Sequence, residues 1–232
     1  MIVRLAGVAR RSPGYAGGMS KEPERIAERL LDVAGTTYAS EAGIKLADTP
    51  AALYRLLVLS VLLSTRIKAD LAVAATRELV KAGAGTPRKM LDTSWQERVD
   101  ALGRAHYVRY DESTATALGE GARLLLDEYK GDLRRLRERA SGDVGELRNL
   151  LCELPRLGAV GADIFCREAQ QVWPELRPYL DRKATSGAGR IGLPEKPSEL
   201  AKLVKDADLA RFSAALVRVA LDKKLAARVT KS

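Results

Sequence analysis

The amino-acid sequence predicts an all-α protein. Three observations lead to this prediction: the composition, the spacing of the apolar residues and the lack of strand patterns. Hydrophobic residues make up 46% of the 232 residues and aromatic residues only 5%, a balance that favours helices over sheets. Apolar residues recur every three or four positions in one segment after another. No pair of alternating apolar and polar runs is joined by a hairpin turn.

The N-terminal region predicts a tail followed by a helix. Residues 1–19 contain no acidic residue and several glycines, so we expect a disordered tail. Ser20 is a suitable helix N-cap, and the folded protein is expected to begin there. The first predicted helix spans 23–34, because Ile26 and Leu30 fall on one helical face.

The following helices are bounded by typical start and stop residues. Thr49 and Pro50 begin a helix that runs to Leu63, with proline at its first position. Ser94 caps another, which ends at Gly103. The other predicted helices are 68–81, a short one from Pro87, 111–129, 143–153, 161–172, 198–204 and 206–226, with turns and short helices between 174 and 196.

Charge and cysteine content narrow the classes of function. The net charge is +9, and residues 177–232 carry 13 Lys/Arg against 6 Asp/Glu, so the basic surplus lies in the last quarter. Such a surface is typical of proteins that bind polyanions. Two cysteines, Cys152 and Cys166, cannot form a disulfide framework and are expected to be small core residues in a reducing, cytoplasmic setting. No apolar run is long enough to span a bilayer, so no membrane partner is expected.

Segment 150–162, with the sequence Leu-Leu-Cys-Glu-Leu-Pro-Arg-Leu-Gly-Ala-Val-Gly-Ala, is the most informative part of the chain. It predicts a helix, a tight turn and a second helix. Such a turn can present backbone N–H groups to a phosphate without reading base sequence. The segment resembles the helix-hairpin-helix of DNA glycosylases related to endonuclease III, whose pattern is Leu-Pro-Gly-Val-Gly, three residues and alanine. The positions that match are Leu154, Pro155, Leu157, Gly158 and Ala162.

Further segments extend the resemblance over about residues 50–195. Residues 62–70 resemble the segment that ends the family's first barrel helix, with Arg66 in place of a glutamine that faces the opened duplex. Residues 99–110 resemble the loop that carries an intercalating wedge. Asp181 and the segment 190–194 resemble the family's catalytic aspartate and the residues that follow it. The interval from the hairpin to Asp181 is a few residues longer than is usual in the family.

The resemblance implies a two-lobed helical fold. Residues 49–165 would form a six-helix barrel lobe that ends in the helix-hairpin-helix. Residues 20–48 and 166–232 would form a second lobe from both ends of the chain, and the active cleft would lie between the lobes. The family's iron–sulfur members end with four cysteines, and this chain ends with none, so the resemblance implies no such cluster. No other metal or cofactor is expected, and a monovalent cation at the hairpin is left open.

Asp181 and Val160 determine the predicted chemistry. The resemblance implies that Asp181 faces the sugar of a flipped nucleotide, where a carboxylate stabilises a cationic sugar and positions water. The alternative is a surface acid paired with Arg182 or Lys183. Val160 stands where lyase members carry a lysine, so no amine is available there for a Schiff base. Lys183 or Lys68 could supply an amine from another direction.

DNA contacts are expected at the hairpin, in the cleft and at the wedge loop. Gly158 and Gly161 are the expected phosphate ligands, and Arg156 is either a phosphate contact or a solvent-facing residue. The predicted DNA-binding set is Arg66, Arg156, Gly158, Val160, Gly161 and Lys183. The predicted wedge set is Arg104, His106, Tyr107 and Arg109. Trp95 and Trp173 are expected to fill core, and the basic run 134–139 is expected to be a solvated helix face.

The function predicted from the sequence is a monofunctional DNA N-glycosylase of base-excision repair. It would act as a monomer on a damaged or mispaired base in double-stranded DNA. Two alternatives stay open. The chain could bind damaged or distorted DNA without catalysis, or it could be a bifunctional glycosylase and lyase with a relocated lysine.

Overall fold

The computed structural model describes residues 22–230, and every regular element in that range is helical. The prediction of an all-α fold is confirmed. The helices are α1 (Glu22–Ala34), α2 (Tyr38–Glu41), α3 (Pro50–Leu63), α4 (Ala69–Lys81), α5 (Pro87–Asp92), α6 (Trp95–Arg104), α7 (Asp111–Tyr129), α8 (Leu133–Arg139), α9 (Val144–Cys152), α10 (Gly158–Ala169), α11 (Arg182–Arg190), α12 (Pro197–Leu200), α13 (Leu209–Leu221) and α14 (Lys223–Thr230), with short 3-10 turns at Pro174–Leu176, Ala201–Leu203 and Asp206–Asp208. The predicted tail and the cap at Ser20 lie outside the described residues.

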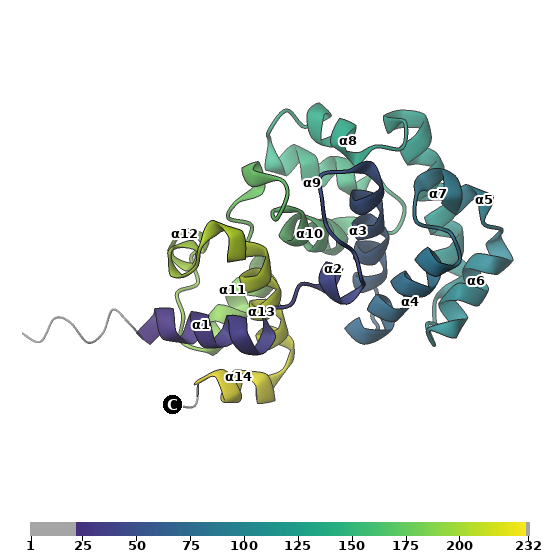
Figure 1. Cartoon of the computed structure of the whole chain (residues 1–232). Helices are drawn as coiled ribbons and strands as arrows, with labels where there is room; N and C mark the ends of the chain where they lie inside the picture. The colour runs from purple at the N-terminus through teal and green to yellow at the C-terminus, as the bar shows by residue number, and fades with distance from the viewer. Residues whose placement is uncertain (1–21, 231–232) are drawn as a thin grey trace, which may run out of the picture.

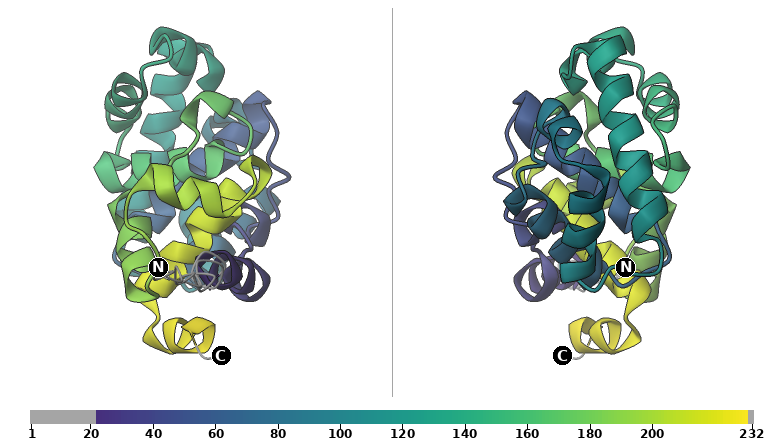
Figure 2. Two further views of the ribbon diagram at one scale, coloured as in Figure 1. Left: turned by 90° about the vertical axis from the view of Figure 1, so that its left-hand side faces the viewer. Right: turned by 90° about the vertical axis from the view of Figure 1, so that its right-hand side faces the viewer.

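The buried apolar residues form two clusters. The larger cluster draws on residues 38–176, and α3 lies inside it, packed against α4, α8 and α10. The smaller cluster joins α1 to residues 180–229. Figure 1 shows α1 and α11–α14 gathered at one end of the molecule and α3–α10 at the other. The side views in Figure 2 place α14 at the outer edge of the smaller end.

The two clusters divide the chain at different residues from the predicted lobes. Helix α2 and residues 166–176, which we expected in the terminal lobe, pack in the larger cluster. Trp173 explains much of this difference. Its side chain is fully buried, its ring lies 5.5 Å from that of Phe165, and its Nε1 donates to Asp48 Oδ1 at 2.9 Å. The chain therefore leaves the larger cluster only after Trp173.

Helix starts agree with prediction where a side chain forms the cap. Ser94 and Glu97 form a reciprocal capping box at the start of α6. Pro50 occupies the first position of α3, as expected, although Thr49 caps no N–H there. Ten of the fourteen residues of α3 are buried, because neighbouring helices cover it on all sides. Helix α3 is therefore a core helix of the larger cluster.

Several boundaries differ from the prediction. Helix α10 begins at Gly158, three residues earlier than expected, because the first helical hydrogen bond runs from Gly161 N to Leu157 O. Helix α2 was not predicted, since four residues carry too little periodicity to detect. The last predicted helix, 206–226, is broken at Asp222, whose extended backbone ends α13 and whose carboxylate accepts from Lys224 N.

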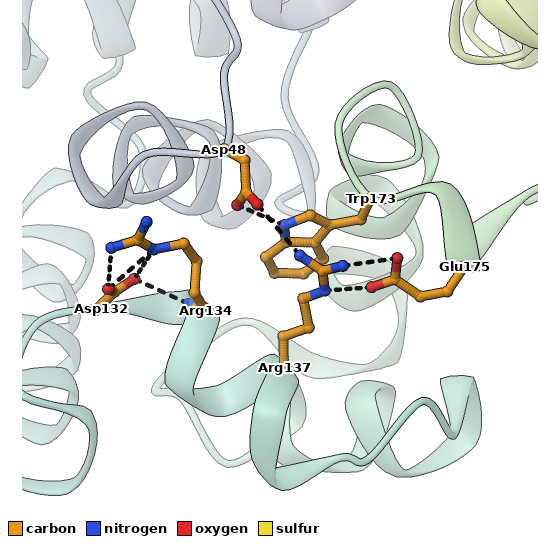
Figure 3. A network of polar contacts seen from close by, with 6 residues as sticks. All are labelled: Asp48, Asp132, Arg134, Arg137, Trp173 and Glu175. Atoms are coloured by element: carbon orange, nitrogen blue, oxygen red, sulfur yellow. Dashed lines mark hydrogen bonds and ion pairs between the residues drawn. The ribbon is translucent and has the colours of Figure 1, made fainter.

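The basic run in α8 is helical, but it is not simply a solvated face. Arg137 lies over the Trp173 ring, 5.2 Å from its centroid, and pairs with both Asp48 and Glu175. Beside it, Arg134 pairs with Asp132 at 2.7 Å. Figure 3 shows this network, in which Asp48 and Arg137 meet at the Trp173 indole and Glu175 binds Arg137. The solvated-face prediction is wrong for Arg137, because its partners are far away in sequence.

Two other expectations about packing are corrected. Trp95 is 41% exposed and donates to Thr116 Oγ1, so it does not fill core. Cys152 is exposed at the end of α9, whereas Cys166 is buried as expected. Burial raises the pKa of the Cys166 thiol to about 12, which keeps it protonated and unreactive.

Helix α6 ends in a Schellman motif with histidine at the left-handed position. His106 has a φ of 59° and donates its N–H to Gly103 O at 2.8 Å. Tyr107 N donates to Leu102 O at 3.0 Å. The side chains of Tyr107 and Leu102 are buried. Glycine is the usual residue at this position, because a side chain is disfavoured at positive φ.

Replacing His106 with glycine is expected to stabilise the fold by about 1 kcal/mol, because it removes the strain of a Cβ at positive φ. Urea unfolding of wild type and variant measures the difference. The matched control is His106→Ala, which keeps the Cβ and should leave the free energy of unfolding within about 0.5 kcal/mol of wild type. Equal stabilities for glycine and alanine would contradict the argument from strain.

Candidate functional site

The hairpin between α9 and α10 is a tight turn with two residues in the left-handed region. Arg156 and Gly158 have φ values of 63° and 54°. Gly161 N donates to Leu157 O at 3.1 Å and is therefore used inside the helix, so the expectation that it binds phosphate is wrong. Helix geometry leaves the N–H groups before it, from Gly158 to Val160, without an intrahelical acceptor. These amides are the better candidates for an anion.

Gly161 has a packing role instead. A Cβ added there would lie 2.8 Å from Leu157 Cδ1 and 3.4 Å from Ser64 Cβ. The glycine therefore allows α10 to lie close to its own turn and to the end of α3. Such close packing fixes the hairpin against the larger cluster.

Arg156 extends toward the start of α7. Its guanidinium lies 5.6 Å from the centroid of the Tyr110 ring and donates to the Ser113 hydroxyl. Arg109 lies on the same ring at 5.2 Å. Both guanidinium groups therefore gather at the exposed N-terminal end of α7. This arrangement brings the hairpin and the predicted wedge loop side by side.

A pocket of about 670 Å³ lies between the two core clusters. It brings together three residues that the sequence singled out, namely Val160, Asp181 and Lys183. Its other lining residues are Tyr38, Leu63, Thr65, Ile67, Ala69, Asp163, Ile164, Arg167, Arg182, Ser186, Val217 and Leu221. Val160 and Leu221 are more than 60% exposed, so apolar side chains stand at its mouth. Arg66 is exposed in the loop that carries Thr65 and Ile67 but does not line the pocket.

Asp181 is the N-cap of α11. Its Oδ1 accepts from Ala184 N at 3.0 Å, and its Oδ2 accepts from Arg167 Nη1 at 2.6 Å. The Asp181 side chain is 8% exposed and that of Arg167 is 6% exposed. The surface pairing with Arg182 or Lys183 is therefore wrong: the partner is Arg167, a buried residue of α10. Sequence reasoning missed Arg167 because no local pattern links it to Asp181.

Two more acidic groups belong to this region. Asp163 Oδ1 accepts from Arg148 Nε at 2.9 Å and from the Tyr179 hydroxyl at 2.5 Å. Burial raises the pKa of Tyr179, so this phenol stays a hydrogen-bond donor. Glu168 is 2% exposed and accepts from Tyr38 N and Ala39 N at 3.1 and 3.0 Å. Glu168 thus fixes the start of α2, whose Tyr38 lines the pocket.

The acidity of Glu168 leads to a pH-dependent prediction. Burial raises its pKa above the ordinary value of 4.5, because desolvation disfavours the charged form. Because the pKa is higher in the folded protein than in the unfolded chain, Glu168 contributes to the free energy of unfolding. This contribution is fully present below pH 4.5 and is lost as pH rises through the folded-state pKa. The glutamine variant has no such titration. We expect the stability of Glu168→Gln, relative to wild type, to improve as pH rises from 4.5.

Urea unfolding of both proteins at several pH values from 4.5 up to about pH 8 measures this trend. The hydrogen bonds from Tyr38 N and Ala39 N favour the charged carboxylate and oppose the effect of burial, which is the larger of the two. The slope of the difference with pH is therefore the quantity that tests the direction of the shift. A difference that is constant with pH would contradict the prediction.

The predicted wedge residues differ in exposure: Tyr107 is buried, whereas the other three are exposed. Tyr107 is 1% exposed, and its hydroxyl lies 3.0 Å from Thr65 Oγ1, so its assignment to the wedge is wrong. The Schellman motif turns this side chain into the core. Arg104 is half-exposed and pairs with Glu78 at 2.9 Å. His106 and Arg109 remain exposed, and between them Val108 is 65% exposed.

Val108 is a residue that sequence reasoning missed. An isolated valine carries no signal of exposure, and only the burial of Tyr107 shows which side chain the loop presents. In residues 22–230, no group of three or more His, Cys, Asp or Glu side chains is placed to hold a metal ion. In the same range, no helix has the length and apolar character needed to cross a membrane.

Comparisons with known proteins add one structural likeness. A solved structure of endonuclease III, trapped as a covalent intermediate with DNA, is similar to this chain with a TM-score of 0.47 and 16% sequence identity. The similarity covers 84% of each chain. No protein-family model matches the chain. No curated protein matches it.

Proposed function

We propose that this protein is a monofunctional DNA N-glycosylase that hydrolyses the glycosidic bond of a flipped base in duplex DNA. The observation that carries the proposal is the pocket in which Asp181, Val160 and Lys183 meet, although the hairpin and Asp181 belong to different segments. A buried carboxylate at the wall of a pocket next to an anion-binding turn is what this reaction requires. The resemblance in sequence assigns the same two segments to the same task.

In the proposed mechanism, Asp181 stabilises positive charge on the sugar and orients the attacking water. A carboxylate oxygen has two lone pairs, so the bonds from Ala184 N and Arg167 Nη1 leave acceptor capacity on each oxygen. Val160 presents only methyl groups to the pocket. The product is then an abasic site with an unbroken strand, because no amine at that position forms a Schiff base.

Binding to the duplex is assigned to the hairpin amides, to Arg182 and Lys183, and to the exposed loop. The N–H groups of Gly158 to Val160 would hold a phosphate. Val108 takes the place of Tyr107 as the side chain that fills the gap left by the flipped nucleotide. We place the protein with DNA in the cytoplasm, acting as a monomer, with binding that weakens as salt rises.

A second function is favoured by one observation. Both carboxylate oxygens of Asp181 already have protein partners, and the side chain is only 8% exposed. A protein that binds damaged or distorted DNA without catalysis would tolerate this pairing. Tight binding of lesion duplexes without base release would favour that function over the glycosylase.

The deciding experiment is a panel of duplex oligonucleotides, each with one lesion. The lesions are an oxidised pyrimidine, an alkylated purine, uracil, 8-oxoguanine, a mismatch and an abasic site. Each duplex is incubated with the protein and scored for strand breaks with and without hot alkali. Strand breaks that appear only after alkali support a monofunctional glycosylase, and the duplex in which they appear identifies the base that it removes.

Lysine chemistry is tested in parallel by borohydride trapping on the same duplexes. Lys183 lines the pocket, so it is the lysine to examine. A trapped covalent complex in wild type that is lost in Lys183→Ala would contradict the monofunctional proposal and establish a relocated lyase residue. Lys183→Arg is the matched control, because it keeps the charge for DNA binding but forms no Schiff base.

A further inference from the structure

Two separate sets of hydrogen bonds attach the segment that carries Asp181 to α10. One set holds its backbone, and the other holds the Asp181 carboxylate. The backbone is held by Gln170, whose Nε2 donates to Tyr179 O and whose Oε1 accepts from Tyr179 N, both at 3.0 Å. Arg177 Nε also donates to Gln170 O at 2.7 Å. These bonds fix the chain two residues before Asp181 without touching its side chain.

The carboxylate of Asp181 is held by Arg167, one helical turn before Gln170. Its own helix supplies only one bond, from Ala184 N to Oδ1. That bond alone leaves the second oxygen of a buried, charged group without a partner, which is unfavourable. The 2.6 Å contact from Arg167 Nη1 to Oδ2 supplies both the partner and the opposite charge. With both oxygens held, the plane of the carboxylate is determined.

Arg167 and Glu168 are neighbouring buried residues of α10, and they contact opposite walls of the pocket. Glu168 holds the first N–H groups of α2, and Tyr38 lies there in the pocket wall. Arg167 reaches the start of α11 on the other side. Both residues are buried. One turn of α10 therefore aligns two pocket walls that come from distant parts of the chain.

We propose that Arg167 is the positioning residue of this site, which sets the orientation of the Asp181 carboxylate toward the sugar. The proposal rests on the proposed function of Asp181. Arg167 acts through Asp181 and need not touch the substrate. Arginine suits this task because its planar guanidinium stays charged and its donors have a fixed geometry.

The test is a double-mutant cycle in the full-length protein. Single-turnover base release is measured for wild type, Arg167→Met, Asp181→Asn and the double variant, on the substrate that the lesion panel identifies. Arg167→Met is expected to lower the rate by about 100-fold, because a small misplacement of a catalytic group has that effect. The double variant is expected to be no slower than Asp181→Asn. Independent, multiplying effects would overturn the proposal.

Two further variants separate positioning from folding. Arg167→Lys keeps the charge and is expected to restore about a tenth or more of the lost rate. Arg211→Met removes an exposed arginine that pairs with Asp208 at 2.6 Å and is expected to leave the rate unchanged. Binding of a duplex with a tetrahydrofuran abasic-site analogue should change less than about tenfold in Arg167→Met, because positioning affects chemistry more than affinity. A loss of rate fully explained by weaker binding would overturn the proposal.

Hydrogen exchange of the Ala184 amide gives a readout that does not depend on catalysis. If wild type releases no base, the proposed function fails, but the structural half of this proposal is still tested. Loss of Arg167 should free the carboxylate and raise the exchange rate of the amide it caps. Unchanged exchange in Arg167→Met would show that Arg167 does not hold Asp181.

Discussion

Replacing Asp181 by asparagine is expected to lower the rate of base release by roughly 100- to 10,000-fold, the range that a positioned acid or base contributes. Asparagine keeps the N-cap bond to Ala184, because its amide oxygen is an equally good cap. It cannot carry the negative charge that stabilises a cationic sugar. Single-turnover kinetics at saturating enzyme measure the effect on the chemical step.

The fold must be followed in the same experiment. The variant leaves Arg167 buried without its counter-charge, and such a loss costs about 3–5 kcal/mol in other buried pairs. Urea unfolding shows whether the variant remains folded under the assay conditions. Unchanged base release in a folded variant would mean that Asp181 is a structural cap and nothing more.

The matched control is Asp163→Asn, because Asp163 is a second carboxylate that lines the same pocket and pairs with an arginine. Its carboxylate is occupied by Arg148 and the Tyr179 hydroxyl. We expect this variant to retain base release within about tenfold of wild type, because it removes the charge that pairs with Arg148 and not the charge assigned to catalysis. An equal loss of base release in Asp163→Asn and Asp181→Asn would mean that the total negative charge of the pocket matters and that Asp181 has no special role.

Replacing Gly187 by alanine is expected to destabilise the fold by about 3 kcal/mol or more. A Cβ at this position would lie 2.0 Å from Leu216 O and 2.8 Å from Leu216 C. These are backbone atoms of α13, so α11 and α13 would have to separate. The two helices form the centre of the smaller cluster, and separation would also displace Asp181 at the start of α11.

Gly189→Ala is the matched control on the same helix. There the added Cβ would meet the carboxyl end of Glu195, an exposed side chain that can move aside. Alanine also has the better helix propensity, so this variant should be as stable as wild type or more stable by about 0.5–1 kcal/mol. Urea unfolding compares the two variants directly. A mild effect at Gly187 would contradict the close packing of α11 on α13.

Local sequence signals predicted most of the helices because their causes are local. Helical spacing of apolar residues, Pro50 at a helix start and the Ser94 cap each act within a few residues. The boundaries that were wrong depend on contacts with distant residues. Residues 166–176 join the larger cluster because Trp173 reaches Asp48, 125 residues away in sequence.

The sequence predicted where several residues of the candidate site lie in the chain, but not which side chains contact one another. The hairpin and Asp181 could be found because short motifs carry them. Tyr107 was misassigned because aromatic residues in a loop are typical of both wedges and core, and its burial depends on Thr65 and Thr114 in other segments. Val108, which the loop exposes instead, carries no local signal.

The helical character of the chain, the position of the hairpin and the lack of a lysine at position 160 could all be predicted from the sequence, since these properties depend on neighbours in the chain. The pairing of charged side chains, in contrast, depends on the packed fold. Asp181 is followed directly by two basic residues, yet it pairs with Arg167 inside the fold. An ion pair depends on distance and burial, and these properties exist only once the helices have packed.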